Sequence, residues 1–435
     1  MTRALAPFLL GFLVLLSGPS CTGGGQPSAP AGAVDGPGAA TASPVHGRIE
    51  QHAGLRVLRV WGTARQRGHA HGTLLASEVA TVAIAEFQAR FARRPGLLEQ
   101  ARAAVGRLIE YPDDVHEELQ GLWQGLQERG VDLGMPELER SFDFTDLLIA
   151  NALDVFGLMG CSGFTVWGEQ AVGGGVLTAR NFDWPMTGAH MLDQTILMVS
   201  HLPGGRAVAA VTWPGFVGAV TGVADDGVAA SLHVGTAKIT YTPEPSSWPS
   251  AIAVREILAH GAGASAATIG KARELLGYTS PPAGFLTHLV LPSLPPSGPP
   301  AVVFETDAKA CVVQEVAAGP VVVTNHFRTR NDGREASRDS LGRERRLQEG
   351  LGNCIAIDDR QISAAEAWDL LSEVDRGGGH AFGTLHSLVF RHDPWFFELR
   401  IGTLGTNGVV AAPDSDRRHA LTRRQVFADG ETFGR

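Results

Sequence analysis

The most constraining feature of this chain is the segment GCSGFTVWGEQAVGGGVLTARNFDW at residues 160–184. Two stretches rich in apolar residues flank three consecutive glycines, a pattern that predicts two antiparallel strands joined by a turn. Side chains directly opposite each other on such strands lie about 5 Å apart. The turn is therefore expected to bring Cys161 close to Arg180, Asn181 and Asp183, which sets a thiol beside a cation, an amide and a carboxylate.

The pattern of expected helices and strands differs before and after this segment. Before it, one strand at residues 55–63 is followed by helical spacing to about residue 158, with a break near Pro112. After it, short strands alternate with pairs of helices, which predicts an α+β fold in which helices cover sheets. The expected later strands are at residues 194–202, 207–213, 216–224, 227–235, 285–292, 301–307, 310–317, 319–325, 384–393 and 395–403, and the later helices at 251–261, 265–277, 339–350 and 363–375.

The N-terminus predicts export. Arg3 precedes an apolar run at residues 5–16, which is too short to span a bilayer and is typical of a secretory signal. The sequence LLSGPSC resembles a bacterial lipoprotein signal, so residues 1–20 are expected to be removed and Cys21 to carry the lipid, with simple secretion as the alternative. Residues 21–45 are rich in Gly, Pro, Ser and Ala and predict a flexible tether.

Composition excludes several classes of partner. The formal charge of −9 and the absence of a basic run interleaved with aromatics argue against a nucleic-acid partner. His69 and His71 lack further ligands at recognisable spacing, so neither a metal nor a cofactor is expected. If Cys21 carries lipid and Cys161 reacts, Cys311 and Cys354 are the two cysteines that could form a disulfide. The sequence does not decide whether they do.

Cys161 admits two interpretations from residues alone. A reactive cysteine needs a lowered thiol pKa or a nearby base, and Arg180 would favour the thiolate. The alternative is a small buried apolar residue, the usual environment of a free cysteine.

A resemblance favours the reactive cysteine. The hairpin with its A-R-N-F-D-W end at residues 179–184 resembles the nucleophile hairpin of the autoproteolytic N-terminal-nucleophile (Ntn) family typified by isopenicillin N acyltransferase, with penicillin V acylases and bile acid hydrolases as more distant relatives. VLRVWGTARQRGHAHGTLL, VVVTNHF, a Ser-x-x-Arg at residues 340–343 and TLHSLVF are similar to further family segments in the same order. The resemblance spans about residues 55–405.

The resemblance implies a four-layer αββα fold and a mechanism. Cleavage of the Gly160–Cys161 bond would leave an N-terminal segment, residues 46–160, associated with a catalytic domain, residues 161–435. The new α-amino group of Cys161 would act as its base. Asn325 is expected to donate to the oxyanion, while Arg180 and Asp183 tune and hold the nucleophile.

Four further residues are expected to bind substrate or support the site: His233, His326, Ser340 and Arg343. Two departures accompany them. Ala224 stands where relatives often have an Asn, and His233 is a candidate substitute donor, with a structural histidine as the alternative. Ser340 and Arg343 also fit an ordinary helix cap followed by an exposed arginine.

Taken together, these features predict an exported autoproteolytic amidohydrolase or acyltransferase that forms a thioester at Cys161. Its expected partners are a small amide or acyl substrate, its own two cleaved chains, and a membrane through the lipid anchor only. Two alternatives stay open: a phospholipase-B-like or lipid-amide hydrolase on the same fold, and a non-catalytic surface-binding lipoprotein.

Overall fold

The computed structural model describes residues 44–153, 160–185, 189–235, 247–281, 283–314, 319–330, 335–357, 361–376, 382–404, 410–411, 417–428 and 433. The expected signal segment, the lipidation site Cys21 and almost all of the expected tether lie outside the described residues. None of the helices in the described part is long and apolar enough to cross a membrane.

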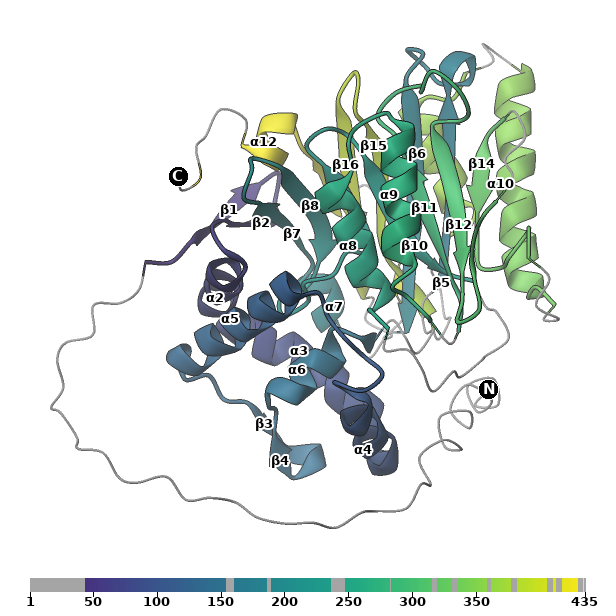
Figure 1. Ribbon diagram of the computed structural model, residues 1–435. Helices are drawn as coiled ribbons and strands as arrows, with labels where there is room; N and C mark the ends of the chain where they lie inside the picture. The colour runs from purple at the N-terminus through teal and green to yellow at the C-terminus, as the bar shows by residue number, and fades with distance from the viewer. Residues whose placement is uncertain are drawn as a thin grey trace, which may run out of the picture.

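Two β-sheets form the centre of the molecule (Figure 1). The larger has nine strands in the order β1-β2-β7-β8-β9-β10-β11-β12-β13, with all neighbours antiparallel except the parallel pair β2 and β7. Its strands are β1 (Gly47–His52), β2 (Leu55–Val60), β7 (Ile196–His201), β8 (Ala207–Thr212), β9 (Thr221–Ala224), β10 (Ala229–Val234), β11 (Phe285–Val290), β12 (Ala301–Thr306) and β13 (Cys311–Val313).

The smaller sheet is antiparallel and contains the predicted hairpin. Its order is β14-β5-β6-β15-β16-β19, in which β5 and β6 are the hairpin strands. The strands are β14 (Val321–Val323), β5 (Gly160–Trp167), β6 (Val176–Pro185), β15 (Phe382–Arg391), β16 (Phe396–Ile401) and β19 (Arg418–Ala420). Two short strand pairs are hydrogen-bonded to neither sheet: β3 (Gly134–Met135) with β4 (Arg140–Ser141), and β17 (Thr403–Leu404) with β18 (Val410–Ala411).

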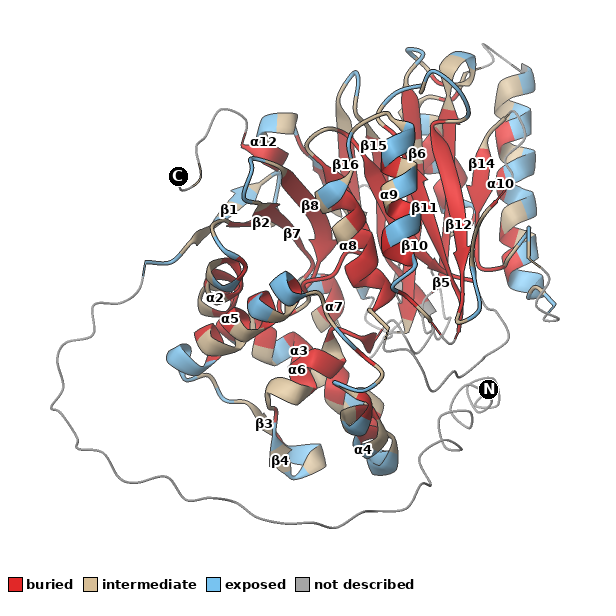
Figure 2. Cartoon of the chain, in the orientation of Figure 1, coloured by how far each residue is buried: buried red, intermediate tan, exposed pale blue. Residues whose placement is uncertain are grey.

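Helices cover the outer face of each sheet, so the layers run αββα and the expected α+β, four-layer fold is confirmed. Helices α8 (Ser250–His260) and α9 (Ala266–Leu276) pack on the larger sheet, and α10 (Arg338–Ile357) and α11 (Ala364–Ser372) on the smaller one. The two sheets meet through β10 with β5 and β12 with β14. Central strands such as β7 read ILMVSH, almost continuously apolar, because both of their faces are covered. Figure 2 shows these strands as the most buried part of the molecule.

A group of N-terminal helices packs at one end of the sheets (Figure 1). They are α2 (Ala64–Leu74), α3 (Ala76–Phe91), α4 (Pro95–Ala104), α5 (Asp113–Arg129) and α6 (Phe144–Ala150), and two short helices, α7 (His190–Asp193) and α12 (Arg423–Phe427), occur later in the chain. The segment before residue 160 also supplies β1 and β2 to the larger sheet. The expected division of the chain at residues 160 and 161 stays a prediction.

The GHAHG motif has a packing role. Gly68 and Gly72 lie where α2 crosses α5, and a Cβ on either would lie 1.8 Å and 2.1 Å, respectively, from a backbone oxygen of α5. Gly121 and Gly125 allow the same approach from the other side. The two backbones can therefore come this close only because both helices present glycine.

Candidate active site

The register of the hairpin brings the predicted residues together. Gly160 pairs with Asp183 and Cys161 with Phe182, so the sequence prediction that Cys161 lies opposite residues 180–184 is confirmed. The Cys161 side chain shares one face of the sheet with Phe182, and that face is directed at the larger sheet. Cys161 is fully buried there.

The Cys161 thiol has a cation as its closest polar partner. Nη2 of Arg180 lies 3.0 Å from Sγ, and Sγ lies 3.4 Å from the carbonyl oxygen of Leu232. Burial raises the pKa of the Cys161 thiol to about 11, an effect that the positive charge of Arg180 opposes. In the uncut chain the thiol is therefore protonated, and it donates to Leu232 while it accepts from Arg180.

The backbone of Cys161 is held by buried side chains as well. Its N–H donates to Oδ1 of Asn325 at 3.0 Å, and Nη1 of Arg343 donates to its carbonyl oxygen at 2.5 Å. Arg343 also donates to the same Oδ1 at 2.7 Å, and Nδ2 of Asn325 donates to the Val234 carbonyl at 2.9 Å. These partners fix the orientation of the Asn325 amide, because its oxygen faces donors and its nitrogen an acceptor.

The expected role of Asn325 as an oxyanion donor is not visible in this arrangement. Its N–H group points at Val234, and its oxygen serves the nitrogen of Cys161. The oxyanion role stays a prediction. Ser340 supports Asn325, because its Oγ accepts from the backbone N–H of Asn325 at 2.7 Å and lies 2.8 Å from Nδ1 of His326.

Asp183 borders the bond expected to be cut. Its Oδ1 accepts from the Thr384 hydroxyl at 2.8 Å, and Oδ2 pairs with Nε of Arg376 at 3.1 Å. Arg376 also pairs with Asp339, which in turn binds Arg343 at 3.0 Å. Successive ion pairs thus connect Asp183, beside Gly160, to Arg343, which binds the Cys161 carbonyl.

Sequence reasoning missed Arg376, Asp339 and Thr384. Arg376 follows α11 by four residues, and its spacing from the other site residues follows no recognisable pattern. Asp339 had a weak signal, because it lies four residues before Arg343 and so on the same face of α10. Arg343 itself is buried, so the interpretation of an exposed arginine after a helix cap is wrong.

His233 lies between the sheets, and within the described part of the chain no hydrogen bond joins its side chain to Cys161. Its Nε2 lies 3.0 Å from the Ser231 hydroxyl. Burial, together with the charge of Arg180, holds the pKa of His233 well below its usual value, so the imidazole is neutral. Ala224 is buried at the far end of β9, three residues beyond Thr221, whose hydroxyl contacts Arg180 at 2.7 Å.

An apolar pocket lies beside the cross-strand partner of Cys161, between the N-terminal helices and the sheets. It encloses about 620 Å³, open space at its mouth included. Phe182, the cross-strand partner of Cys161, forms part of its wall, as does Val220, whose carbonyl accepts from Arg180. The other lining residues are Val82, Ala83, Glu86, Ala150, Leu153, Trp184, Met191, Trp213, Pro214, Gly215 and Phe216.

The two histidines of GHAHG serve separate contacts. Nε2 of His71 accepts from the backbone N–H of Gly215 at 2.9 Å, and His69 pairs with Glu128 at 2.6 Å. Within the described ranges no three His, Cys, Asp or Glu side chains gather as metal ligands. Cys311 and Cys354 are both free thiols, on β13 and α10.

Comparisons with known proteins give distant similarities. No family model matches the chain. Protein dcd1B from Dictyostelium discoideum is 28% identical over 188 residues, 39% of this chain and 36% of that protein, so the chain spans about a third of the length of this curated relative.

Three solved structures resemble the chain at low identity. A mutant of conjugated bile acid hydrolase from Clostridium perfringens is 13% identical and covers 60% of this chain and 96% of its own, with a TM-score of 0.41. An N-acylethanolamine-hydrolyzing acid amidase orthologue from Caenorhabditis elegans is 16% identical, covers 53% and 92%, and has a TM-score of 0.37. Penicillin V acylase from Agrobacterium tumefaciens is 15% identical, covers 55% and 83%, and has a TM-score of 0.36. The four-layer arrangement itself rests on the strand pairing and helix packing of this chain.

Proposed function

We propose that this protein is an amide hydrolase of the Ntn type whose nucleophile is Cys161, released at a new N-terminus by cleavage of the Gly160–Cys161 bond. One observation carries the proposal: the N, O and Sγ atoms of Cys161 contact Asn325, Arg343 and Arg180, respectively. All three partners are buried. A cysteine that only fills space needs none of these polar partners.

Chain cleavage would start from the protonated thiol. Sγ attacks the carbonyl carbon of Gly160, the C–N bond breaks, and the nitrogen of Cys161 takes the thiol proton to become an amine. Water then hydrolyses the thioester, which leaves a carboxylate on Gly160 and restores the thiol. Arg180 stabilises the sulfur as it loses its proton, and Asn325 and Arg343 hold the Cys161 backbone during the attack.

In the cut protein the α-amino group would serve as the base. Its reference pKa is near 8, suited to accept the thiol proton and to return it to the leaving amine. Attack of Sγ on the substrate carbonyl gives a thioester, and water completes the hydrolysis. An acceptor amine in place of water would make the reaction an acyl transfer, but water is the abundant acceptor outside the cytoplasm.

The apolar pocket supports an apolar acyl group as the part of the substrate next to the thiol. Phe182 and Val220 connect this pocket to Cys161 and Arg180. Among the alternatives, a lipid-amide hydrolase is favoured by this lining over a hydrolase of polar acyl groups.

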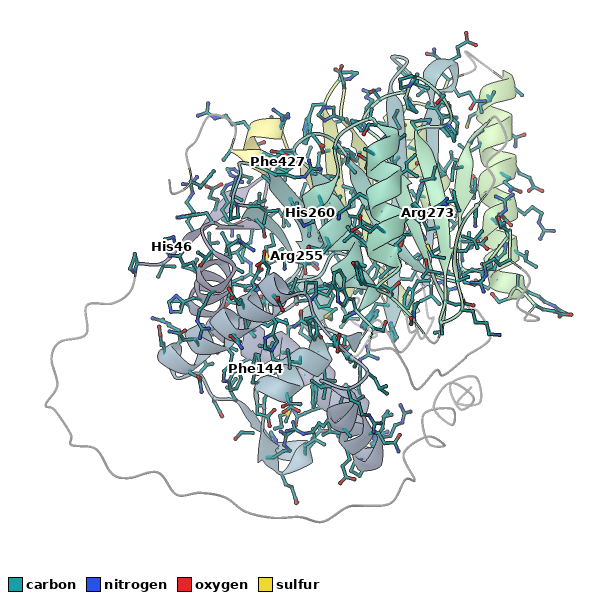
Figure 3. All side chains as sticks on the ribbon, viewed as in Figure 1. His46, Phe144, Arg255, His260, Arg273 and Phe427 are labelled. Atoms are coloured by element: carbon teal, nitrogen blue, oxygen red, sulfur yellow. The ribbon has the colours of Figure 1, made fainter. Side chains whose placement is uncertain are left out.

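The two chains are proposed to stay together after the cut. Glu118 on α5 binds Arg255 on α8 at 2.6 Å and Arg67 on α2 at 3.1 Å, and all three side chains are buried. Figure 3 labels Arg255 at the boundary between the N-terminal helices and the sheet layers. Export and a lipid anchor at Cys21 complete the proposal.

The test is the intact mass of the purified protein over time, beside Cys161→Ala and, as a matched control, Cys311→Ala. We expect two fragments with Cys161 at the new N-terminus in the wild type and in the control, and one uncut chain in Cys161→Ala. The cut protein is then assayed with amides of increasing acyl length. An uncut wild-type chain with an unreactive thiol would instead favour a non-catalytic binding protein.

A further inference from the structure

The strand β15 contains an irregularity beside the nucleophile. Thr384 pairs with Asp183 and His386 with Phe182. Between these two pairs β15 therefore has one more residue than β6, which is a β-bulge. In a regular strand, residues two apart occupy the same face, but Asp183 and Phe182 point to opposite faces. The bulge lets Thr384 bind the Asp183 carboxylate while His386 shares the face of Phe182 and Cys161.

His386 connects to the thiol through two other side chains. Its Nε2 lies 2.8 Å from Oγ1 of Thr221, which lies 2.7 Å from Nη1 of Arg180. The other terminal nitrogen of Arg180 contacts Sγ of Cys161 at 3.0 Å. His386 is fully buried, and its ring stacks on Phe182 with centroids 5.0 Å apart.

The direction of these hydrogen bonds follows from the donors. Arg180 can only donate, so Thr221 accepts from it and has its own hydroxyl proton left for Nε2 of His386. A ring that accepts at Nε2 in this way is neutral and carries its proton on Nδ1, for which the described residues offer no acceptor. Burial and the nearby Arg180 hold the pKa of His386 well below its usual value, which agrees with a neutral ring.

We propose that His386 is a positioning residue, which orients the Arg180 guanidinium toward the Cys161 thiol through the hydroxyl of Thr221. This inference rests on the proposed role of Cys161 as nucleophile. Without an acceptor at position 386, the Thr221 hydroxyl is free to rotate, and Arg180 loses one of the partners that fix its plane. The Val220 carbonyl still binds Nη1, so the effect is partial.

The test compares His386→Phe, which keeps a ring to stack on Phe182 but removes the acceptor, with Thr221→Val and Thr221→Ser. Each protein is incubated until it is cut, and the rate of alkylation by iodoacetamide is followed at Cys161 by peptide mass spectrometry across pH. His419→Asn is the matched control, because His419 is a buried histidine of the same sheet on β19.

We expect His386→Phe and Thr221→Val each to raise the apparent pKa of the Cys161 thiol, with alkylation about tenfold slower at a fixed pH below that pKa. The double variant should add nothing further, and Thr221→Ser should restore the wild-type profile. If the alkylation rate of His386→Phe or Thr221→Val depends on pH as in the wild type, the inference is overturned. If His386→Phe does not fold, the result for Thr221→Val decides. An uncut or inert wild type would overturn the proposed function as well, and it is recognised before any variant is compared.

Discussion

Gly160 lies against the carboxylate of Asp183. A Cβ placed on Gly160 would lie 3.2 Å from Oδ2 and 3.3 Å from Cβ of Asp183, closer than most Cβ contacts. It would also lie 3.6 Å from Cζ of Arg376. The residue before the proposed cut is therefore small because a carboxylate and a guanidinium already occupy the space around it.

This contact predicts a graded effect of side-chain size on cleavage. Gly160→Ala needs a shift of only a few tenths of an ångström and should slow cleavage slightly, whereas Gly160→Val should slow it about 5- to 150-fold, since overpacking costs about 1–3 kcal/mol. Intact mass against time measures both. Gly270→Ala and Gly270→Val are the controls, because a Cβ at Gly270 meets nothing within 4 Å. Wild-type cleavage in Gly160→Val would contradict the steric explanation.

Arg343→Lys should impair cleavage although it keeps the charge. Arg343 contacts three oxygens at once, on Cys161, Asn325 and Asp339, and an ammonium cannot reproduce this fork. Because a hydrogen bond from a charged group contributes about 1.5–3 kcal/mol, cleavage is expected to slow about 10- to 100-fold. The control is Arg345→Lys, an exposed arginine of the same helix. Equal cleavage rates in the two variants would remove Arg343 from the proposed site.

Glu118→Gln should destabilise the fold strongly. The substitution leaves Arg67 and Arg255 buried without a carboxylate, which costs about 3–5 kcal/mol. Urea unfolding of the uncut Cys161→Ala protein measures the difference, with the exposed Glu128→Gln as control. A loss below about 1 kcal/mol would show that the cluster does not hold the N-terminal helices to α8.

The pH dependence of Glu118 has a definite sign. Burial raises the pKa of Glu118, but the positive charges of Arg255 and Arg67 lower it by more than burial raises it. The folded-state pKa of Glu118 therefore lies below the unfolded value. Its contribution is complete above the unfolded pKa, near 4.3 in model peptides, and is lost as the pH falls through the folded pKa. Glu118→Gln should flatten this acidic part of the stability profile.

His71 should make the free energy of unfolding depend on pH over a higher range than Glu118 does. Burial lowers the pKa of His71 from 6.5 to about 4, so the folded state keeps the ring neutral. Stability is complete above pH 6.5 and falls between pH 6.5 and 4, by about 3 kcal/mol in total. His71→Gln keeps an acceptor for the Gly215 N–H and should flatten this slope, as urea titrations at several pH values would measure. An unchanged slope would assign the loss to another group.

The hairpin was predictable because its determinants are local. A glycine turn and two flanking strands set the register, and the register alone decides which residues oppose Cys161. Much of the rest was also predictable from periodicity: α5 begins directly after Pro112 as expected, whereas the helix expected to run up to Pro112 ends at Ala104. The parallel pairing of β2 with β7 was not predictable from periodicity, because it joins segments more than a hundred residues apart.

The sequence by itself thus determined the order of the elements, the α+β class and the neighbourhood of Cys161 along one hairpin. Only the tertiary structure decided which distant side chains reach that cysteine. Arg376 arrives from the segment after α11, and His386 reaches Thr221 because a bulge shifts β15 by one residue. Such contacts depend on the stacking of two sheets and on a local irregularity in pairing, and neither leaves a periodic pattern in the chain.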